Sequence, residues 1–136
     1  RPFSRVLDQL RKAELRPTRQ RLALAKLLFE NDHRHITAET LHEEAAAANV
    51  RVSLATVYNT LHQFTAAGLL REIVVDATRS YFDTNTSDHH HFFHEGSGRL
   101  EDIAAERIVV SELPPPPRGT TVARVDVIVR VTEDNQ

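Results

Sequence analysis

The sequence predicts an α+β fold, with an N-terminal winged helix-turn-helix domain and a small C-terminal α/β dimerisation domain. Apolar residues recur at helical spacing through the first half of the chain, and two short β-like runs follow it. The second half turns to short strands, one of which alternates with a period of two. We expect the first domain to span residues 1–83, a small polar hinge residues 84–88, and the second domain residues 89–136.

The first two helices are expected over residues 4–14 and 18–30. Ser4 and Thr18 are suitable N-caps, and apolar residues recur on one face of each helix. Pro17 separates the two helices because the residue before a proline disfavours helical geometry. This region is basic: residues 1–26 carry eight Arg or Lys and only two acidic residues. The charge suits either a polyanionic partner or simple solvation.

A third helix is predicted over residues 37–49, and a fourth over residues 53–67 that ends at Gly68. The expected buried face of the fourth helix comprises Leu54, Val57, Leu61 and Phe64. Its opposite face comprises Thr56, Asn59 and Gln63, flanked by Tyr58 and His62. This opposite face is polar but uncharged, whereas a solvated helix normally uses Glu and Lys. Such a face suits base edges in a major groove.

Two β-like runs, residues 69–75 and 80–83, are expected to form a hairpin. Helices followed by a hairpin indicate a winged helix-turn-helix, with residues 53–67 as the recognition helix and the hairpin as the wing. This half has no Gly-rich phosphate loop, no strand-helix-strand alternation and no suggestive nucleophile-base pair. The residues therefore favour DNA binding over catalysis.

The second half is expected to contain strands over residues 89–95 and 99–103, which flank a Gly-Ser-Gly turn. A helix is expected over residues 104–112, stopped by four consecutive prolines, and a half-buried strand over residues 124–131. Roughly fifty residues are few for an isolated core, so we expect this half to form a homodimer. A dimer would also supply two recognition helices for two half-sites.

Four of the eight histidines lie within residues 89–94. Because side chains alternate along a strand, His89 and His91 are expected on one face and His90 on the other. Two imidazoles on one face, with carboxylates nearby in sequence, outline a metal site. The alternatives are a solvated polar loop or a purification tag, but a tag would lie at a terminus and many residues follow this run.

The composition bounds the remaining possibilities. The chain has 136 residues, 40% of them hydrophobic, and no apolar run approaches the roughly 20 residues that span a membrane. Cysteine is absent, so any metal must be held by nitrogen and oxygen. A cytoplasmic location is expected. The chain begins at Arg1 and has no methionine, so a short N-terminal piece is expected to be missing.

The chain resembles the ferric uptake regulator family over nearly its whole length, and three stretches carry the resemblance. Residues 53–61 (SLATVYNTL) resemble the family's recognition-helix signature, and residues 16–21 (RPTRQR) its N-terminal signature. Residues 81–83 (YFD) with His89 and His91 resemble its metal-binding region. The triple histidine, Asn59 and the lack of cysteine are similar to the iron response regulator branch, whose members are haem- and iron-responsive transcription factors.

The resemblance implies roles for particular residues. The expected contacts to double-stranded operator DNA are made by Tyr58, Thr56, Asn59, Gln63, Arg16 and Arg19. The expected regulatory metal ligands, joining the two domains, are His35, Asp83, His89, His91 and Asp102. Three imidazoles and two carboxylates suit Fe²⁺, Mn²⁺ or Zn²⁺.

Two departures from the family pattern carry expectations of their own. The first cysteine pair of the family's structural zinc site falls on His94 and Ser97, so that site should be absent. A further family metal site maps partly to Asp88 and His90, but its last histidine falls near Arg124. The branch therefore implies that the triple histidine binds haem, with His90 as the most available axial ligand.

The expected function is that of an iron- or haem-responsive transcriptional regulator, mainly a repressor, that acts as a homodimer without membrane attachment and is not an enzyme. Two rivals are a small His/Asp non-haem metalloenzyme, for which the second half looks too small, and a passive haem or metal buffer. The buffer leaves the uncharged face of the fourth helix unexplained.

Overall fold

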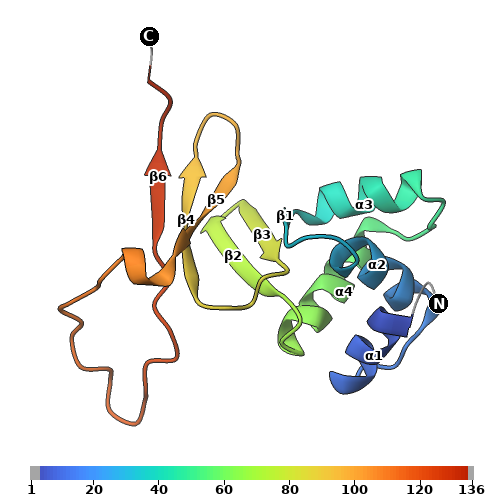
Figure 1. Ribbon diagram of the computed structural model, residues 1–136, viewed down its shortest axis with the longest axis horizontal. Coiled ribbons are helices and arrows are strands. Elements are labelled where there is room, and N and C mark those ends of the chain that lie inside the picture. The colour runs from blue at the N-terminus through green and yellow to red at the C-terminus, as the bar shows by residue number, and fades with distance from the viewer. Residues whose placement is uncertain (1–3, 135–136) are drawn as a thin grey trace. The chain divides into compact units, whose positions relative to one another are not determined.

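The computed structural model describes residues 4–134 of the chain, which divides into two compact units, residues 1–86 and 87–136. The first unit contains four helices and a small sheet, and the second contains a sheet and a long irregular segment (Figure 1). The α+β class predicted from the sequence is confirmed. No helix of the described residues is long and apolar enough to cross a membrane.

The four helices of the first unit begin close to where the sequence places them. They are α1 (Ser4–Lys12), α2 (Arg19–Phe29), α3 (Ala38–Ala47) and α4 (Leu54–Ala66). Thr18, Thr37 and Ser53 are the N-caps of the last three, and each side-chain oxygen accepts a hydrogen bond from a backbone N–H in the first helical turn. After α4 the chain turns at Gly68, whose φ of 82° is a conformation that glycine adopts without strain.

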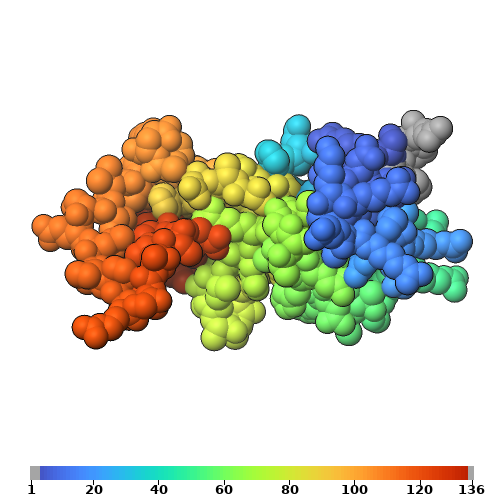
Figure 2. All heavy atoms as spheres, turned by 90° about the horizontal axis from the view of Figure 1, so that it is seen from below, coloured from blue at the N-terminus to red at the C-terminus, as the bar shows by residue number. Residues whose placement is uncertain are grey.

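One apolar core holds these helices together. Leu10 of α1, Leu24 of α2, Leu41 of α3 and Leu61 of α4 are each fully buried in it. The space-filling view shows the residues of α1 and α2, in blue, packed directly against the green residues of the following helices (Figure 2). One core prediction is wrong, because Leu54 at the start of α4 is 36% exposed.

The sheet of the first unit has the order β1-β3-β2. β2 (Arg71–Asp76) and β3 (Arg79–Asp83) form the predicted hairpin. The short strand β1 (His35–Ile36), which lies between the helices predicted over residues 18–30 and 37–49, pairs antiparallel with β3 and sets His35 opposite Asp83. A strand of two residues is too short to show the alternating apolar pattern by which strands are recognised in a sequence. The pairing exists because Ile36 and Phe82, which are opposite each other, are both buried.

The sheet of the second unit has the order β5-β4-β6. β4 (His89–His94) and β5 (Leu100–Ala104) are the predicted antiparallel pair, and β6 (Ile128–Val131) lies parallel to β4 on its other side (Figure 1). Along β4 the residues alternate between buried and half-buried, as the period of a strand requires.

Two predictions for the second unit are wrong. In place of a helix over residues 104–112 there is one 3₁₀ turn, η1 (Ala105–Arg107), and no regular structure until β6. The run Ile108-Val109-Val110 explains this, since β-branched side chains lose rotamer freedom in a helix and the proline run follows soon after. The last strand is also shorter than predicted, and Val129 within it is 36% exposed.

The N-cap of α4 gives a test of this local structure. Ser53→Ala removes the oxygen that accepts from the N–H of Thr56, at 3.0 Å. We expect the free energy of unfolding, measured by urea titration of the circular dichroism signal, to fall by about 1 kcal/mol. Glu43→Ala, at an exposed position of α3, is the control and should change it by less than about 0.5 kcal/mol. Equal values for the two variants would contradict the cap.

Candidate functional site

α4 presents the polar, uncharged face that the sequence predicts. Asn59 and Gln63 are exposed, Thr56 and Tyr58 are half-buried, and Val57, Leu61 and Phe64 are buried on the opposite side. The hydroxyl of Thr56 accepts a hydrogen bond from the Ser53 hydroxyl, at 2.9 Å, so the first turn of the helix is well ordered. The exposed face therefore carries hydrogen-bonding groups on a rigid element and no formal charge.

Tyr58 is held by a residue of another helix. Its hydroxyl donates a hydrogen bond of 2.7 Å to Oε2 of Glu39, in the first turn of α3. This bond raises the pKa of the Tyr58 phenol and lowers the pKa of the Glu39 carboxyl, because it stabilises the protonated phenol beside an ionised acceptor. The phenol oxygen is thereby left as an acceptor for any further partner. No sequence pattern predicted this contact between Glu39 and Tyr58.

The start of α2 lies beside α4. A hollow of about 400 Å³ separates them and is lined by Arg16, Thr18, Gln20, Arg21, Thr56, Asn59, Thr60 and Gln63. Four of the six predicted DNA-contacting residues, Arg16, Thr56, Asn59 and Gln63, line this one hollow, while Arg19 follows the Thr18 cap. The charged side chains that line this hollow are those of Arg16 and Arg21, and arginine is a common ligand of DNA phosphates. Arg21 donates from Nε and Nη2 to Oε1 of Gln63.

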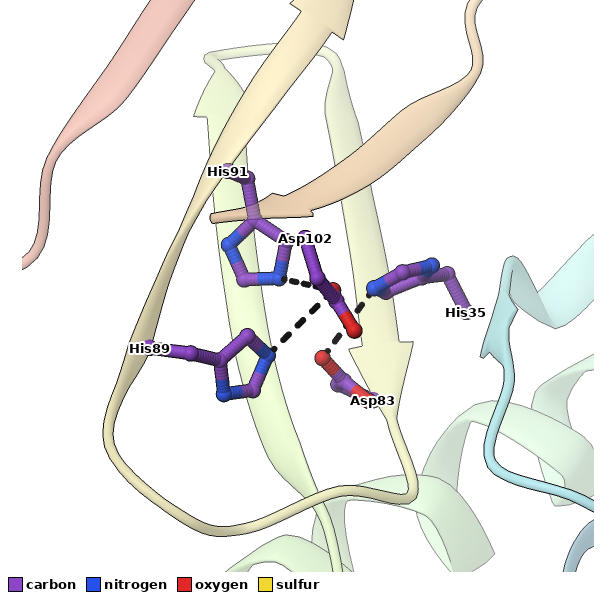
Figure 3. A group of neighbouring side chains, drawn as sticks. All are labelled: His35, Asp83, His89, His91 and Asp102. Atoms are coloured by element: carbon purple, nitrogen blue, oxygen red, sulfur yellow. Dashed lines mark ion pairs between the residues drawn. The ribbon is translucent and has the colours of Figure 1, made fainter. Parts of the chain in front are cut away.

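In the second unit, three of the predicted metal ligands lie together. The register of β4 and β5 sets His91 opposite Asp102, and His89 is two residues away on the same face. Nε2 of His89 and Nε2 of His91 lie 3.5 Å and 3.4 Å from Oδ1 of Asp102 (Figure 3). The two imidazoles are nearly buried, with side chains 6% and 4% exposed, while Asp102 is 48% exposed. The three donors thus converge at a point open to solvent on one side.

The tautomer of His89 follows from its hydrogen bond. Its Nδ1 lies 2.6 Å from the carbonyl oxygen of Ser87, which can only accept, so Nδ1 carries the proton in the neutral ring. The lone pair is then on Nε2, the atom that faces Asp102. A carbonyl partner of this kind orients a ligating histidine and increases its basicity.

The first unit supplies the other two predicted ligands. Because β1 pairs with β3, Nε2 of His35 lies 3.2 Å from Oδ2 of Asp83 (Figure 3). The Asp83 side chain is only 1% exposed. A carboxylate this buried needs a positive partner, which a protonated imidazole or a metal ion can provide. Each of the five residues offers one atom suited to a metal.

His90 is on the other face of β4 and differs from its neighbours. Its Nδ1 accepts a hydrogen bond of 3.1 Å from the backbone N–H of Val127. In a neutral ring with Nδ1 as the acceptor, the proton is on Nε2, which then has no lone pair for a metal. Haem ligation by His90 stays a prediction, and in this conformation the ring would first have to give up its bond to Val127.

The other histidines have bonding or packing partners within their own unit. Nε2 of His42 lies 3.1 Å from the carbonyl oxygen of Val52, and Nδ1 of His33 lies 3.3 Å from the Thr84 hydroxyl. The ring of His62 packs against Phe82, with centroids 5.6 Å apart.

The chain also matches a known protein family. The sequence profile described as the ferric uptake regulator family matches residues 12–125, which is most of the chain. The chain belongs to that family. It is 36% identical over 97 residues to the peroxide-responsive repressor PerR of Staphylococcus epidermidis, an alignment that covers 71% of this chain and 64% of PerR. The match therefore spans slightly less than two thirds of that relative.

Solved structures of a ferric uptake regulator and of a manganese uptake regulator have the same fold. One from Pseudomonas aeruginosa with manganese is 26% identical, with a TM-score of 0.71 over 95% of this chain and 98% of its own. A zinc-bound manganese uptake regulator is 21% identical, with a TM-score of 0.66 over 93% of this chain and 98% of its own. These names describe regulators and a repressor, and none describes an enzyme.

His94, on which the family resemblance places the first zinc-binding cysteine, lies among charged side chains. Nδ1 of His94 lies 3.1 Å from Glu133, and its Nε2 lies 3.3 Å from Glu101. Arg99 also pairs with Glu101, at 3.3 Å. Nη2 of Arg99 donates to Nε2 of His94, at 3.0 Å, so in the neutral ring Nδ1 carries the proton and can donate to Glu133. These contacts join β4 to β5 and to the residues after β6. The predicted absence of the structural zinc stays a prediction.

The Tyr58–Glu39 bond can be tested without DNA. In a Tyr81→Phe background Tyr58 is the sole tyrosine, so the absorbance of tyrosinate reports its titration alone. Glu39→Ala should lower the pKa of Tyr58 towards its ordinary value of about 10, because the carboxylate that stabilises the protonated phenol is lost. Glu43→Ala, one turn further along α3, is the matched control and should leave the titration unchanged. A Tyr58 pKa that is insensitive to Glu39 would mean the bond is not formed in solution.

Proposed function

We propose that this chain is a metal-responsive, DNA-binding transcriptional regulator, chiefly a repressor, that acts as a homodimer on operator DNA in the cytoplasm. The observation that carries the proposal is the exposed face of α4, which is rich in hydrogen-bonding groups and has no charge. Membership of the ferric uptake regulator family supports it, and so does the similarity to a protein named a repressor.

The chemistry of the proposed DNA-contacting residues divides them into those that contact bases and those that contact phosphates. Tyr58, Asn59 and Gln63 of α4 would enter the major groove and contact base edges, with Thr56 at the edge of the helix. Arg16 and Arg19 would contact phosphates, which fixes the register of α4 on the duplex but carries no sequence information.

For the metal, we propose that one divalent ion takes ligands from both units: His89, His91 and Asp102 from the second, and His35 and Asp83 from the first. The support is that each set is chemically incomplete. The second unit offers two imidazoles and one carboxylate, fewer donors than Fe²⁺ or Mn²⁺ normally takes. The first unit offers one imidazole and one buried carboxylate, which are also too few donors for such an ion on their own.

A bound ion would supply positive charge at the point where the carboxylates converge and would favour the interdomain arrangement that brings both ligand sets together. This chain's own residues prepare for that event. The Ser87 carbonyl fixes His89 with Nε2 available, and the β1–β3 pairing holds His35 beside Asp83. The angle between two recognition helices in a dimer would then depend on occupancy.

The donor set of nitrogen and oxygen suits Fe²⁺, Mn²⁺ and Zn²⁺ alike, so iron is proposed only from resemblance to the iron response regulator branch. The same resemblance supports haem as a second effector at the triple histidine. Of the three histidines, His89 and His91 direct Nε2 towards Asp102, and His90 accepts a hydrogen bond from Val127. Haem ligation would therefore have to replace one of these contacts.

A homodimer is supported by the surface of the second unit. Val109, Val110, Leu113 and Val122 are between 45% and 82% exposed, all in the irregular segment between η1 and β6. So many exposed large apolar side chains in a unit of this size are typical of an interface.

The alternative function, a small metalloenzyme, has no comparable support. The candidate metal-binding side chains of the second unit are on a small sheet, and no family relative named above is an enzyme.

The decisive experiment is selection of duplexes from a random pool by the full chain, followed by gel-shift measurements with MnCl₂ and with a chelator. We expect one sequence class to be enriched and its affinity to change when metal is removed. Tyr58→Ala should weaken binding to the selected duplex by about 5- to 150-fold, the equivalent of one good base contact, and leave metal content unchanged. If no sequence is enriched under either condition, the proposed function is wrong.

The metal site is tested by ligand variants read by mass spectrometry and by Mn²⁺ titration. Asp102→Ala should lower Mn²⁺ affinity by more than the 10- to 100-fold typical of an outer-shell partner, since it removes a ligand. His35→Ala should also lower it and reduce the response of DNA affinity to Mn²⁺. His42→Ala, a half-buried histidine of α3 in the first unit, is the control. Normal metal content in both ligand variants would place the ion elsewhere.

A further inference from the structure

Arg21 holds the side-chain amide of Gln63 in one orientation. Nε and Nη2 of Arg21 both donate to Oε1 of Gln63, at 3.2 Å and 3.0 Å. Nη1 of the same guanidinium donates to the carbonyl oxygen of Arg16, at 2.9 Å. The guanidinium is therefore anchored to the loop before α2 on one side and grips α4 on the other. Three of its five N–H groups are used in this way.

The arrangement removes the ambiguity that an amide side chain normally has. A glutamine can present either its oxygen or its NH₂ to a partner by rotating the amide through 180°. Arginine has only donors, so it can be satisfied by Oε1 and not by Nε2. As long as the two side chains remain paired, Oε1 is directed towards Arg21 and the NH₂ is directed away from it.

The NH₂ of Gln63 is what remains for recognition. Gln63 is exposed on α4, and within the described part of the chain its Nε2 has no hydrogen-bond partner. In the major groove guanine presents two acceptors, N7 and O6, whereas adenine presents the acceptor N7 beside the donor N6–H. The usual two-bond contact of glutamine with adenine needs the amide oxygen as an acceptor. That oxygen is already occupied here.

We propose that Arg21 is a positioning residue that sets the base preference of α4: by occupying Oε1 of Gln63, it restricts the amide to donating and so favours guanine over adenine at the base pair beneath it. The inference rests on the proposed DNA-binding function and specifies which edge this one position of the helix reads. Gln63 is the residue that touches the base, and Arg21 acts through it.

The competing explanation is that Arg21 is simply a phosphate ligand. Its two remaining N–H groups could meet a phosphate, and losing them would weaken binding to every sequence alike. The two explanations differ in what they predict for base preference. A phosphate contact changes affinity and its salt dependence, but not the ratio between guanine and adenine at one base pair.

The test uses the full chain with MnCl₂ and the duplex that it enriches from a random pool. Every base pair of that duplex is replaced singly, and Gln63→Ala identifies the pair at which the preference depends on Gln63. At that pair the wild type should bind guanine about tenfold more tightly than adenine, and Arg21→Ala should reduce this ratio to about one or invert it. Arg21→Lys, which keeps the charge but lacks the planar fork, should have the same effect on the ratio.

Two further variants separate the explanations. Gln63→Glu keeps an acceptor for Arg21 but has no donors, so it should lose the preference for guanine as fully as Gln63→Ala. Arg19→Ala, the matched control two residues from Arg21, should weaken binding to all duplexes and leave the ratio intact. Thermal unfolding of each variant checks that the fold is retained.

The possible outcomes are distinct. A guanine-to-adenine ratio that survives both Arg21 variants overturns the proposal, as does a base scan in which Gln63→Ala changes no preference. In either case Tyr58 and metal dependence can still support the proposed function. Failure of the chain to enrich any duplex would instead overturn the proposed function itself.

Discussion

The buried carboxylate of Asp83 is the constraint on which the first unit's contribution to the proposed metal site depends. At 1% exposure it cannot remain charged without a partner, and His35 is that partner at 3.2 Å. His35 reaches it only because the two-residue strand β1 pairs with the end of β3, where Ile36 and Phe82 are both buried. The contact between Ile36 and Phe82 thus places His35 beside Asp83. These two residues are the potential metal ligands of the first unit.

The proposed DNA-binding surface follows the same rule, since two of its polar groups are oriented by residues outside α4. Glu39 of α3 accepts from Tyr58, and Arg21 of α2 donates to Gln63. Tyr58 donates to Glu39 and keeps its oxygen as an acceptor for a partner. Gln63 accepts from Arg21 and keeps its NH₂ as a donor for a partner. Packing of α2 and α3 against α4 in a single core is what keeps these donors and acceptors in place.

The sequence predicted what depends on local pattern and missed what depends on distant contacts. The caps Thr18, Thr37 and Ser53, the buried stripe of α4 and the hairpin are local features, and the structure has them. β1, the grip of Arg21 on Gln63 and the bond from Val127 to His90 join residues far apart in sequence, so no periodicity could reveal them. The helix expected over residues 104–112 is not formed, because the three β-branched residues 108–110 disfavour helical geometry.

In the proposed mechanism, the division of the ligands between the two units determines whether metal binding can act as a signal. An ion held only by His89, His91 and Asp102 would bind the second unit with the same affinity whatever the first unit was doing, and such a ligand shifts no conformational equilibrium. His35 and Asp83 change this, because an ion that also needs them binds more tightly when both units present their ligands together. Each tenfold gain in affinity from the added ligands contributes about 1.4 kcal/mol towards that arrangement. In the proposed mechanism, therefore, the second unit supplies most of the affinity for the metal, and the His35–Asp83 pair converts occupancy into a change in the DNA-binding unit.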